Sequence, residues 1–131
     1  MAKPERYLLD TQACYLWAFG KLPPKVLKQL SRPDIVIYYS DLSAWEVMTK
    51  RTYVKDQFAY AHFWEFVHEI QAQPHHLTRR DLDKFSDLPF YKEHTDPFDR
   101  MIVAQALAAN LTLIGGDRQF PRYEGLQILW E

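Results

Sequence analysis

Four acidic residues have the types and positions that could bind a divalent cation. Asp10 and Asp117 each follow an apolar segment typical of a buried strand, whereas Glu46 and Asp99 lie in segments typical of helices. Carboxylates that share one cleft repel one another unless a cation compensates their charge. Ligands that offer only oxygen favour a hard ion such as Mg²⁺, and Mn²⁺ accepts the same ligands. The chemistry that this suits is phosphodiester hydrolysis, in which one or two ions activate water and stabilise the leaving oxygen.

The segments that must position these acids alternate between strand and helix patterns. Short apolar runs rich in β-branched and aromatic residues predict strands, and amphipathic or capped segments predict helices. This alternation predicts an α/β fold with a mostly parallel sheet. The expected strands are 6–9, 35–39, 111–114 and 126–129. Two expected helices end near residues 17 and 50, and four others span 24–30, 56–71, 78–85 and 97–110. Pro74 is expected to close the helix 56–71, and residues 86–95 are expected to form a loop.

Two of these helices have clear N-terminal signals. Asp96 is an expected N-cap, followed by Pro97 at the first helical position and by Asp99 in the first turn. Ser40 can cap the helix that carries Glu46. In open parallel sheets, ligands bind where the strands end, and a crossover helix begins at that same edge. If the first strand and the strand 111–114 are neighbours, all four acids converge on one edge.

Each acid also has a purely structural explanation. Asp10 and Asp117 can cap the turns that follow them. Glu46 can pair with Lys50 at i,i+4, and Asp99 can complete a capping box. The sequence leaves both explanations open for each residue.

Length, composition and charge exclude several classes of protein. The 131 residues, 47% hydrophobic and 25% charged, predict one globular domain spanning 1–131. Sixteen basic against 17 acidic residues exclude a globally basic nucleic-acid binder. The single cysteine, Cys14, excludes a disulfide framework and a cysteine-based zinc site. The longest apolar run, Ala13 to Phe19, is too short for a membrane span, and the N-terminus lacks a signal-peptide pattern, so we expect a cytoplasmic protein.

Four blocks of sequence around the acids form a recognisable pattern. The most specific block reads H-T-D-P-F-D-R from His94 and continues to A-Q-A at 104–106. The others are Tyr7 to Thr11, Ser43 to Val47 with Lys50, and 111–118 with Phe120 and Tyr123. Together these blocks resemble the PIN-domain family, and specifically the VapC-like ribonuclease toxins of bacterial toxin–antitoxin pairs.

The resemblance implies a three-layer α/β/α fold with a sheet of four to five strands. It implies that Asp10, Glu46, Asp99 and Asp117 form an acidic metal site that cleaves single-stranded RNA with Mg²⁺ or Mn²⁺. It also implies a homodimer and a VapB-like antitoxin that blocks the cleft.

Three basic residues near the acidic blocks could hold RNA phosphates: Arg118, Lys50 and Arg100. The alternative is that they are solvated surface charges or partners of the acids. The five histidines match no zinc spacing, although His94 could line the cleft. The aromatic residues of 58–66 could stack bases, but packing explains their helical period better.

The sequence departs from the family pattern at two positions near the acids. Gln12 stands where such proteins often have histidine, and Gly115 stands where they often have a hydroxyl residue. Losing that hydroxyl removes a hydrogen bond within the acidic site, and the segment Arg51 to Glu93 shows no match.

A second hypothesis is therefore a catalytically weak or inactive module that acts by binding a protein partner. A third, a phosphoaspartate-forming domain, fits poorly because no second acid lies near Asp10.

Overall fold

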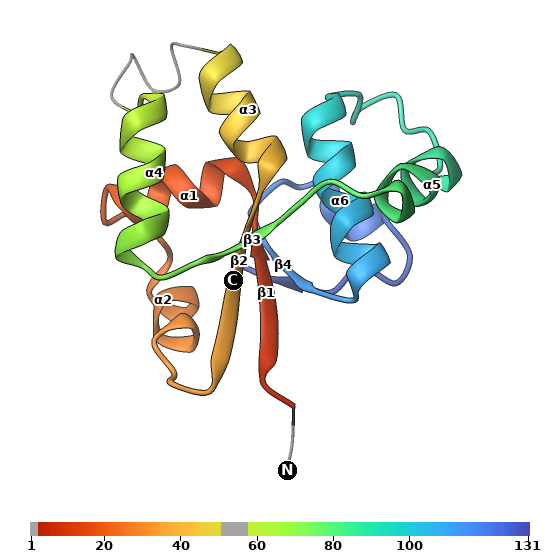
Figure 1. Cartoon of the computed structure of the whole chain (residues 1–131). Coiled ribbons are helices and arrows are strands. Elements are labelled where there is room, and N and C mark those ends of the chain that lie inside the picture. Colours follow the sequence, from red (N-terminus) through yellow and green to blue (C-terminus); the bar gives the residue numbers. More distant parts are fainter. Residues whose placement is uncertain (1–2, 51–57) are drawn as a thin grey trace.

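A five-stranded parallel sheet forms the centre of the molecule (Figure 1). The computed structural model of this chain describes residues 3–50 and 58–131. The strand order is β3-β2-β1-β4-β5, and every pair of neighbours runs parallel. The strands are β1 Glu5–Leu9, β2 Ile35–Ser40, β3 Gln73–His75, β4 Thr112–Ile114 and β5 Ile128–Leu129. The structure thus confirms the predicted α/β class, with a sheet that is wholly parallel.

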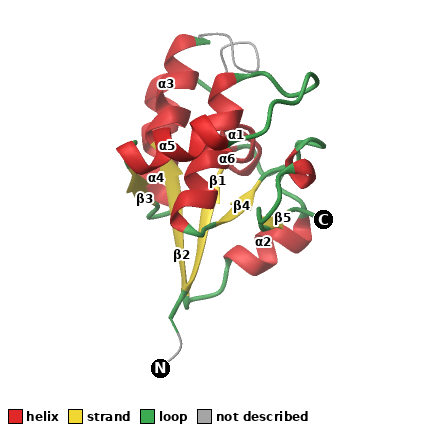
Figure 2. Ribbon diagram, turned by 90° about the vertical axis from the view of Figure 1, so that its right-hand side faces the viewer, coloured by secondary structure: helices red, strands yellow, loops and turns green. Residues whose placement is uncertain are grey.

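Helices cover both faces of this sheet, which gives three layers (Figures 1 and 2). The helices α1, α2 and α4 pack on one face, and α5 and α6 pack on the other. The helix α3 contributes residues to both apolar clusters. The helices are α1 Thr11–Ala18, α2 Pro24–Leu30, α3 Asp41–Thr49, α4 Tyr60–Glu69, α5 Arg79–Asp87 and α6 Pro97–Ala109, with a 3-10 turn at Phe120–Arg122.

The central strand β1 is buried on both of its faces. Tyr7 and Leu9 belong to the cluster under α1, α2 and α4, whereas Leu8 belongs to the cluster under α6. Successive side chains of a strand point to opposite faces, so an unbroken apolar run is the expected pattern for a strand covered on both sides. β1 therefore carries its following residue, Asp10, to a fixed place at the edge of the sheet.

One strand was missing from the sequence prediction. The helix expected at 56–71 spans Tyr60–Glu69 as α4, and the expected start at 56–57 lies outside the described residues. The chain turns at Gln71, whose φ of 58° is left-handed, and Gln73–His75 then pairs with β2 as the outer strand β3. The prediction that Pro74 closes the helix was wrong, because α4 ends at Glu69 and Pro74 lies within β3. Proline lacks the N–H of an inner strand, but an edge strand tolerates it.

The predicted helix caps are present. The Ser40 hydroxyl accepts from the backbone N–H of Leu42 at 3.0 Å, at the start of α3. The Asp96 carboxylate accepts from the N–H groups of Phe98 and Asp99 at 2.8 and 3.2 Å, with Pro97 at the first position of α6. These local signals fix where α3 and α6 begin, and hence where Glu46 and Asp99 lie.

The glutamine of the A-Q-A block joins three elements inside the molecule. Gln105 is fully buried on α6, accepts a hydrogen bond from the Ser40 hydroxyl at the end of β2, and donates to Asp81 on α5 at 3.3 Å. Asp81 in turn forms a capping box with Thr78. This network holds α5 and α6 against the same edge of the sheet that carries the acids. None of the helices in the described ranges is long and apolar enough to cross a membrane.

Candidate active site

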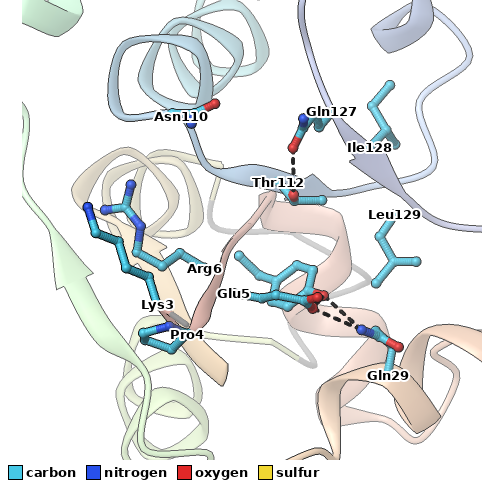
Figure 3. A pocket seen from close by; sticks show the side chains of 11 residues that line it. Lys3, Pro4, Glu5, Arg6, Gln29, Asn110, Thr112, Gln127, Ile128 and Leu129 are labelled. Carbon is cyan, nitrogen blue, oxygen red and sulfur yellow. Dashed lines mark hydrogen bonds between the residues drawn. The ribbon is translucent and has the colours of Figure 1, made fainter. Parts of the chain in front are cut away.

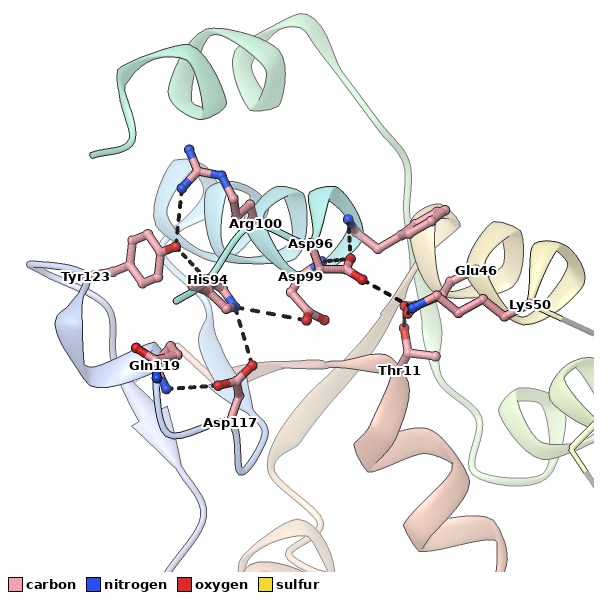
Figure 4. A network of polar contacts seen from close by, with 11 residues as sticks. Thr11, Glu46, Lys50, His94, Asp96, Asp99, Arg100, Asp117, Gln119 and Tyr123 are labelled. Carbon is pink, nitrogen blue, oxygen red and sulfur yellow. Dashed lines mark hydrogen bonds and ion pairs between the residues drawn. The ribbon is translucent and has the colours of Figure 1, made fainter. Parts of the chain in front are cut away.

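The four predicted acids lie together at the carboxyl edge of the sheet, and Figure 4 shows three of them, Glu46, Asp99 and Asp117. Because β1 and β4 are neighbours, Asp10 and Asp117 leave the sheet side by side. Glu46 comes from α3 and Asp99 from the first turn of α6. Asp10 and Glu46 are only 4% and 2% exposed, whereas the side chains of Asp99 and Asp117 are 31% and 29% exposed. The site is therefore buried at its base and open toward Asp99 and Asp117.

Hydrogen bonds from the chain fix the acids in place. Asp10 caps α1, because its Oδ1 accepts from the N–H of Ala13 at 2.7 Å. The Oδ1 of Asp117 accepts from the N–H of Gln119 at 2.8 Å. The second oxygen of Asp117 faces His94, whereas the second oxygen of Asp10 lies next to Gly115. The structural explanations that the sequence allowed are thus correct, and they do not exclude a role in the site.

Glu46 is held from two sides. The Thr11 hydroxyl donates to its Oε1 at 2.6 Å, and the ammonium group of Lys50 lies 2.8 Å from its Oε2. The same ammonium group lies 3.2 Å from Asp96. Lys50 therefore joins α3 to the start of α6 along one rim of the site (Figure 4).

The negative charge of the site exceeds what the chain itself compensates. The pKa of Asp10 is raised to about 8, mainly by burial, to which the charges of Asp99, Glu46 and Asp117 add and which one hydrogen bond from the backbone of Ala13 opposes. Burial also raises the pKa of Asp99 to about 7, together with the charges of Asp96, Glu46 and Asp117. Carboxyl groups with such pKa values bind a cation or retain their protons.

Asp96 differs from its acidic neighbours. Burial raises its pKa, but hydrogen bonds from the backbone of Asp99 and from Lys50 outweigh that effect and lower the pKa overall. The compensated acid at this edge is therefore the helix cap, and the excess charge lies at Asp10 and Asp99.

Two groups of side chains could each hold a metal ion. His94, Asp99 and Asp117 form one group, and in each group the ligand atoms lie within 4.8 Å of one another. Glu46, Asp96 and Asp99 form the other, so that Asp99 belongs to both. Asp96 had been predicted only as a cap, although its position three residues before Asp99 already placed both carboxylates at one helix start.

Asp10 belongs to neither group in the described part of the chain, and its second oxygen, Oδ2, lies next to Gly115. A Cβ atom at position 115 would lie 2.4 Å from the Oδ2 of Asp10 and 2.7 Å from the ring of Phe120. Gly115 therefore does more than leave out a hydroxyl group. Its missing side chain leaves room for the Asp10 carboxylate next to the end of β4.

The three basic residues proposed to contact RNA have different surroundings. Lys50 is 41% exposed at the rim, and Arg118 is exposed on the turn after Asp117. Arg100 is only 9% exposed, and its Nη1 donates to the backbone oxygen of Pro89 at 3.0 Å and to the Tyr123 hydroxyl at 3.4 Å. The placement of Arg100 does not support the expected phosphate contact. Its guanidinium instead holds the loop that leads into α6.

A pocket lies at the opposite edge of the sheet, where β1 begins (Figure 3). Its volume is about 610 Å³, and its walls include Glu5, Gln29 and Thr112. Gln29 donates to Glu5 at 3.0 Å, and Arg32 lies 3.6 Å from the same carboxylate. The charge of Glu5 is thus already paired within the chain, and the four acids lie at the other edge.

A family model decides which proteins this chain is related to. The model for the PIN domain matches residues 7–126, which include all four acids. The chain belongs to the PIN domain family. No match is found among curated proteins.

Solved structures share the fold of this PIN domain at low sequence identity. A chain in the crystal structure of VapBC2 from Rickettsia felis, bound to a DNA fragment from its promoter, has a TM-score of 0.75 and 18% identity and covers 96% of this chain and 99% of that chain. A chain of DNA-bound VapBC from Salmonella typhimurium has a TM-score of 0.68 and 17% identity, and the match covers 95% of this chain and 97% of that chain. A chain of VapBC-1 from nontypeable Haemophilus influenzae has a TM-score of 0.65 and 16% identity, and the match covers 95% of this chain and 96% of that chain.

Proposed function

We propose that this PIN domain is a metal-dependent endoribonuclease that cleaves single-stranded RNA and serves as the toxin of a type II toxin–antitoxin pair. Membership of the PIN family and the fold shared with VapBC chains support this proposal. The proposal includes a VapB-like antitoxin, a homodimer, one domain over residues 1–131 and an action in the cytoplasm, where an RNA substrate is found.

The observation that carries the proposal is the convergence of four carboxylates at one sheet edge, two of them with strongly raised pKa values. The excess negative charge and the oxygen donors fit Mg²⁺ or Mn²⁺. When bound, such an ion lowers the pKa of water and stabilises charge on the leaving oxygen. Without a cation, the same carboxylates would repel an RNA phosphate.

We assign the four acids separate roles in this reaction. Asp10 and Asp99 are proposed as direct metal ligands, and Asp117 as a direct or water-mediated ligand. Glu46 is proposed to orient the attacking water or accept its proton, because Thr11 and Lys50 hold its carboxylate in a fixed position.

The rim of the site offers contacts suited to a single strand. Lys50 and Arg118 are exposed and can approach phosphates. Trp45, next to Glu46 on α3, is 54% exposed and packs edge-to-face on Phe98, with ring centroids 5.2 Å apart. An unpaired base can stack on such an aromatic face, whereas a base within a duplex cannot reach it.

The test compares cleavage of labelled single-stranded RNA by the wild type and by Asp99→Asn. Each protein is assayed with Mn²⁺, with Mg²⁺ and with a chelator. Asp83→Asn is the matched control, because Asp83 is a 68% exposed acid on α5. We expect ion-dependent cleavage by the wild type and the control, and a loss of ~10²-fold or more in Asp99→Asn.

Two results would contradict the proposal. Equal cleavage by the wild type and Asp99→Asn would remove Asp99 from the site. Absence of cleavage by a folded wild type over a broad set of RNAs, together with tight binding of a small protein partner, would favour the non-catalytic module instead.

A further inference from the structure

His94 is a buried histidine whose ring points one nitrogen at the acids. Its side chain is 4% exposed, and its Nε2 lies 3.3 Å from the Oδ2 of Asp117 and 4.0 Å from the Oδ2 of Asp99 (Figure 4). Among the described residues, this Nε2 has no hydrogen-bond partner. A buried polar atom without a partner is costly, which calls for an explanation at this position.

The other face of the imidazole is held firmly by the chain. The Nδ1 of His94 lies 2.6 Å from the Tyr123 hydroxyl, which also accepts from the Nη1 of Arg100. Arg100 is itself fixed by the backbone oxygen of Pro89 and by the ring of Phe85. The ring orientation is therefore set from outside the acidic site, as is usual for histidines that bind metals through the opposite nitrogen.

We propose that His94 is a nitrogen ligand of the divalent cation, through Nε2, beside Asp99 and Asp117. This inference rests on the proposed metal site and adds a property to it, which is a preference among metals. Neighbouring ligands on one octahedral ion lie about 3 Å apart, and the three ligand atoms here all lie within 4.8 Å of one another. An ion between them would give Nε2 a ligand bond in place of a missing hydrogen bond and would compensate both carboxylates.

A mixed nitrogen and oxygen site selects differently from a site of oxygen alone. Imidazole suits transition metals, whereas Mg²⁺ prefers carboxylate and water. His94 should therefore favour Mn²⁺ over Mg²⁺. Tyr123 and Arg100 act as positioning residues, because they contact the ring and not the ion.

A second histidine in the molecule provides an internal comparison. The Nε2 of His75 also has no hydrogen-bond partner among the described residues, and it lies 3.7 Å from Asp81. That carboxylate already accepts from Gln105 and from the N–H of Thr78. His75 does not belong to either candidate metal group of the described chain.

The test uses electron paramagnetic resonance of Mn²⁺ added alone to the purified full chain. Pulsed measurements detect magnetic coupling between Mn²⁺ and a directly bonded ¹⁴N nucleus, and titration gives the Kd for Mn²⁺. The variant His94→Asn keeps a polar group near the position of Nδ1 and removes Nε2. His75→Asn is the matched control, and Tyr123→Phe removes the partner of Nδ1 while leaving the ring in place.

The wild type and His75→Asn should show ¹⁴N coupling of equal strength. In His94→Asn the coupling should disappear and the Kd for Mn²⁺ should rise by ~10-fold or more, with a smaller rise for Mg²⁺ measured by competition. In Tyr123→Phe the Kd should rise by ~10-fold, while the coupling persists at saturating Mn²⁺.

Three outcomes separate this inference from the proposed function. Mn²⁺ bound to the wild type without ¹⁴N coupling, or coupling that persists in His94→Asn, overturns the role of His94 and leaves the nuclease proposal standing. Coupling in a protein that cleaves no RNA supports His94 and overturns the nuclease proposal. Failure of the folded wild type to bind Mn²⁺ overturns both.

Discussion

At the scale of single residues, the acids of this site combine structural and chemical roles in one side chain. Asp10 and Asp117 each accept a hydrogen bond from a backbone N–H through one carboxylate oxygen. Glu46 accepts from Thr11 and Lys50, which fix its position at the buried base of the site. The same hydrogen bonds that shape the turns therefore preorganise the carboxylates, so little rearrangement is needed when a cation binds.

The raised pKa of Asp99 predicts how the free energy of unfolding of the metal-free protein depends on pH. Its pKa of about 7 in the folded chain exceeds the ordinary value near 3.8 in the unfolded chain. Between these values the unfolded chain releases a proton that the folded chain retains, so stability falls as pH rises from about 4 through 7. Asp99→Asn removes this loss. At pH 8 with a chelator, the variant should exceed the wild type by ~1–2 kcal/mol in the free energy of unfolding.

Urea unfolding at pH 8 and at pH 4 measures this difference. At pH 4 the folded chain holds the proton and the unfolded chain has released only part of it, so most of the loss has not yet occurred and the two proteins should differ by less than ~0.5 kcal/mol. A difference that is the same at both pH values would mean that the charge of Asp99 does not destabilise the folded chain.

At the scale of elements, the site depends on where strands end and where the following helices begin. β1 ends at the cap of α1, β2 ends at the cap of α3, and α6 starts at its own aspartate cap. Gln105 on α6 stabilises this arrangement, because its side chain bonds to Ser40 at the end of β2 and to Asp81 on α5. The A-Q-A block thus has a structural role, although it was noticed as part of a functional motif.

Gln105→Leu should destabilise the protein, because the Ser40 hydroxyl and the Asp81 carboxylate lose a buried partner. The expected loss is ~1–3 kcal/mol in the free energy of unfolding, as found when buried polar groups lose partners. Gln127→Leu is the matched control, since the Gln127 side chain is exposed and its hydrogen bond to Thr112 is in contact with solvent. The control should stay within ~0.5 kcal/mol of the wild type. Equal losses in the two variants, measured by urea unfolding, would show that the network contributes nothing.

At the scale of the whole molecule, the order of the strands decides that a site exists. The order β3-β2-β1-β4-β5 places β1 between β2 and β4, so segments from both halves of the chain meet at one edge. Asp10 and Asp117 are 107 positions apart in sequence and lie at the ends of paired strands. A ligand that binds these acids therefore ties the two halves of the fold together.

Binding of Mn²⁺ should consequently stabilise the entire fold. At a free concentration of about 100 times the Kd, the gain in the free energy of unfolding should be ~2.7 kcal/mol. Thermal unfolding at pH 8 should show a rise in Tm for the wild type and for Asp83→Asn. Asp99→Asn should show less than about a third of this gain, because Asp99 belongs to both candidate metal groups. A full gain in Asp99→Asn would place the bound ion elsewhere.

The sequence by itself determined the α/β class and most of the helices and strands, and it predicted that four acids meet at one edge. These follow from local patterns, because a buried strand, an N-cap and a first-turn proline are recognisable within a few residues. The short strand Gln73–His75 escaped because its residues become a strand only by pairing with β2.

Only the tertiary structure decided how the acids and their neighbours interact. The raised pKa values of Asp10 and Asp99 depend on burial and on charges from distant segments. Arg100 is buried and donates hydrogen bonds to the Tyr123 hydroxyl and to the backbone oxygen of Pro89. The same hydroxyl contacts the Nδ1 of His94, whose Nε2 faces the acids. Such effects arise from distances between residues far apart in the chain, and these distances are fixed only when the sheet is ordered and its two faces are packed.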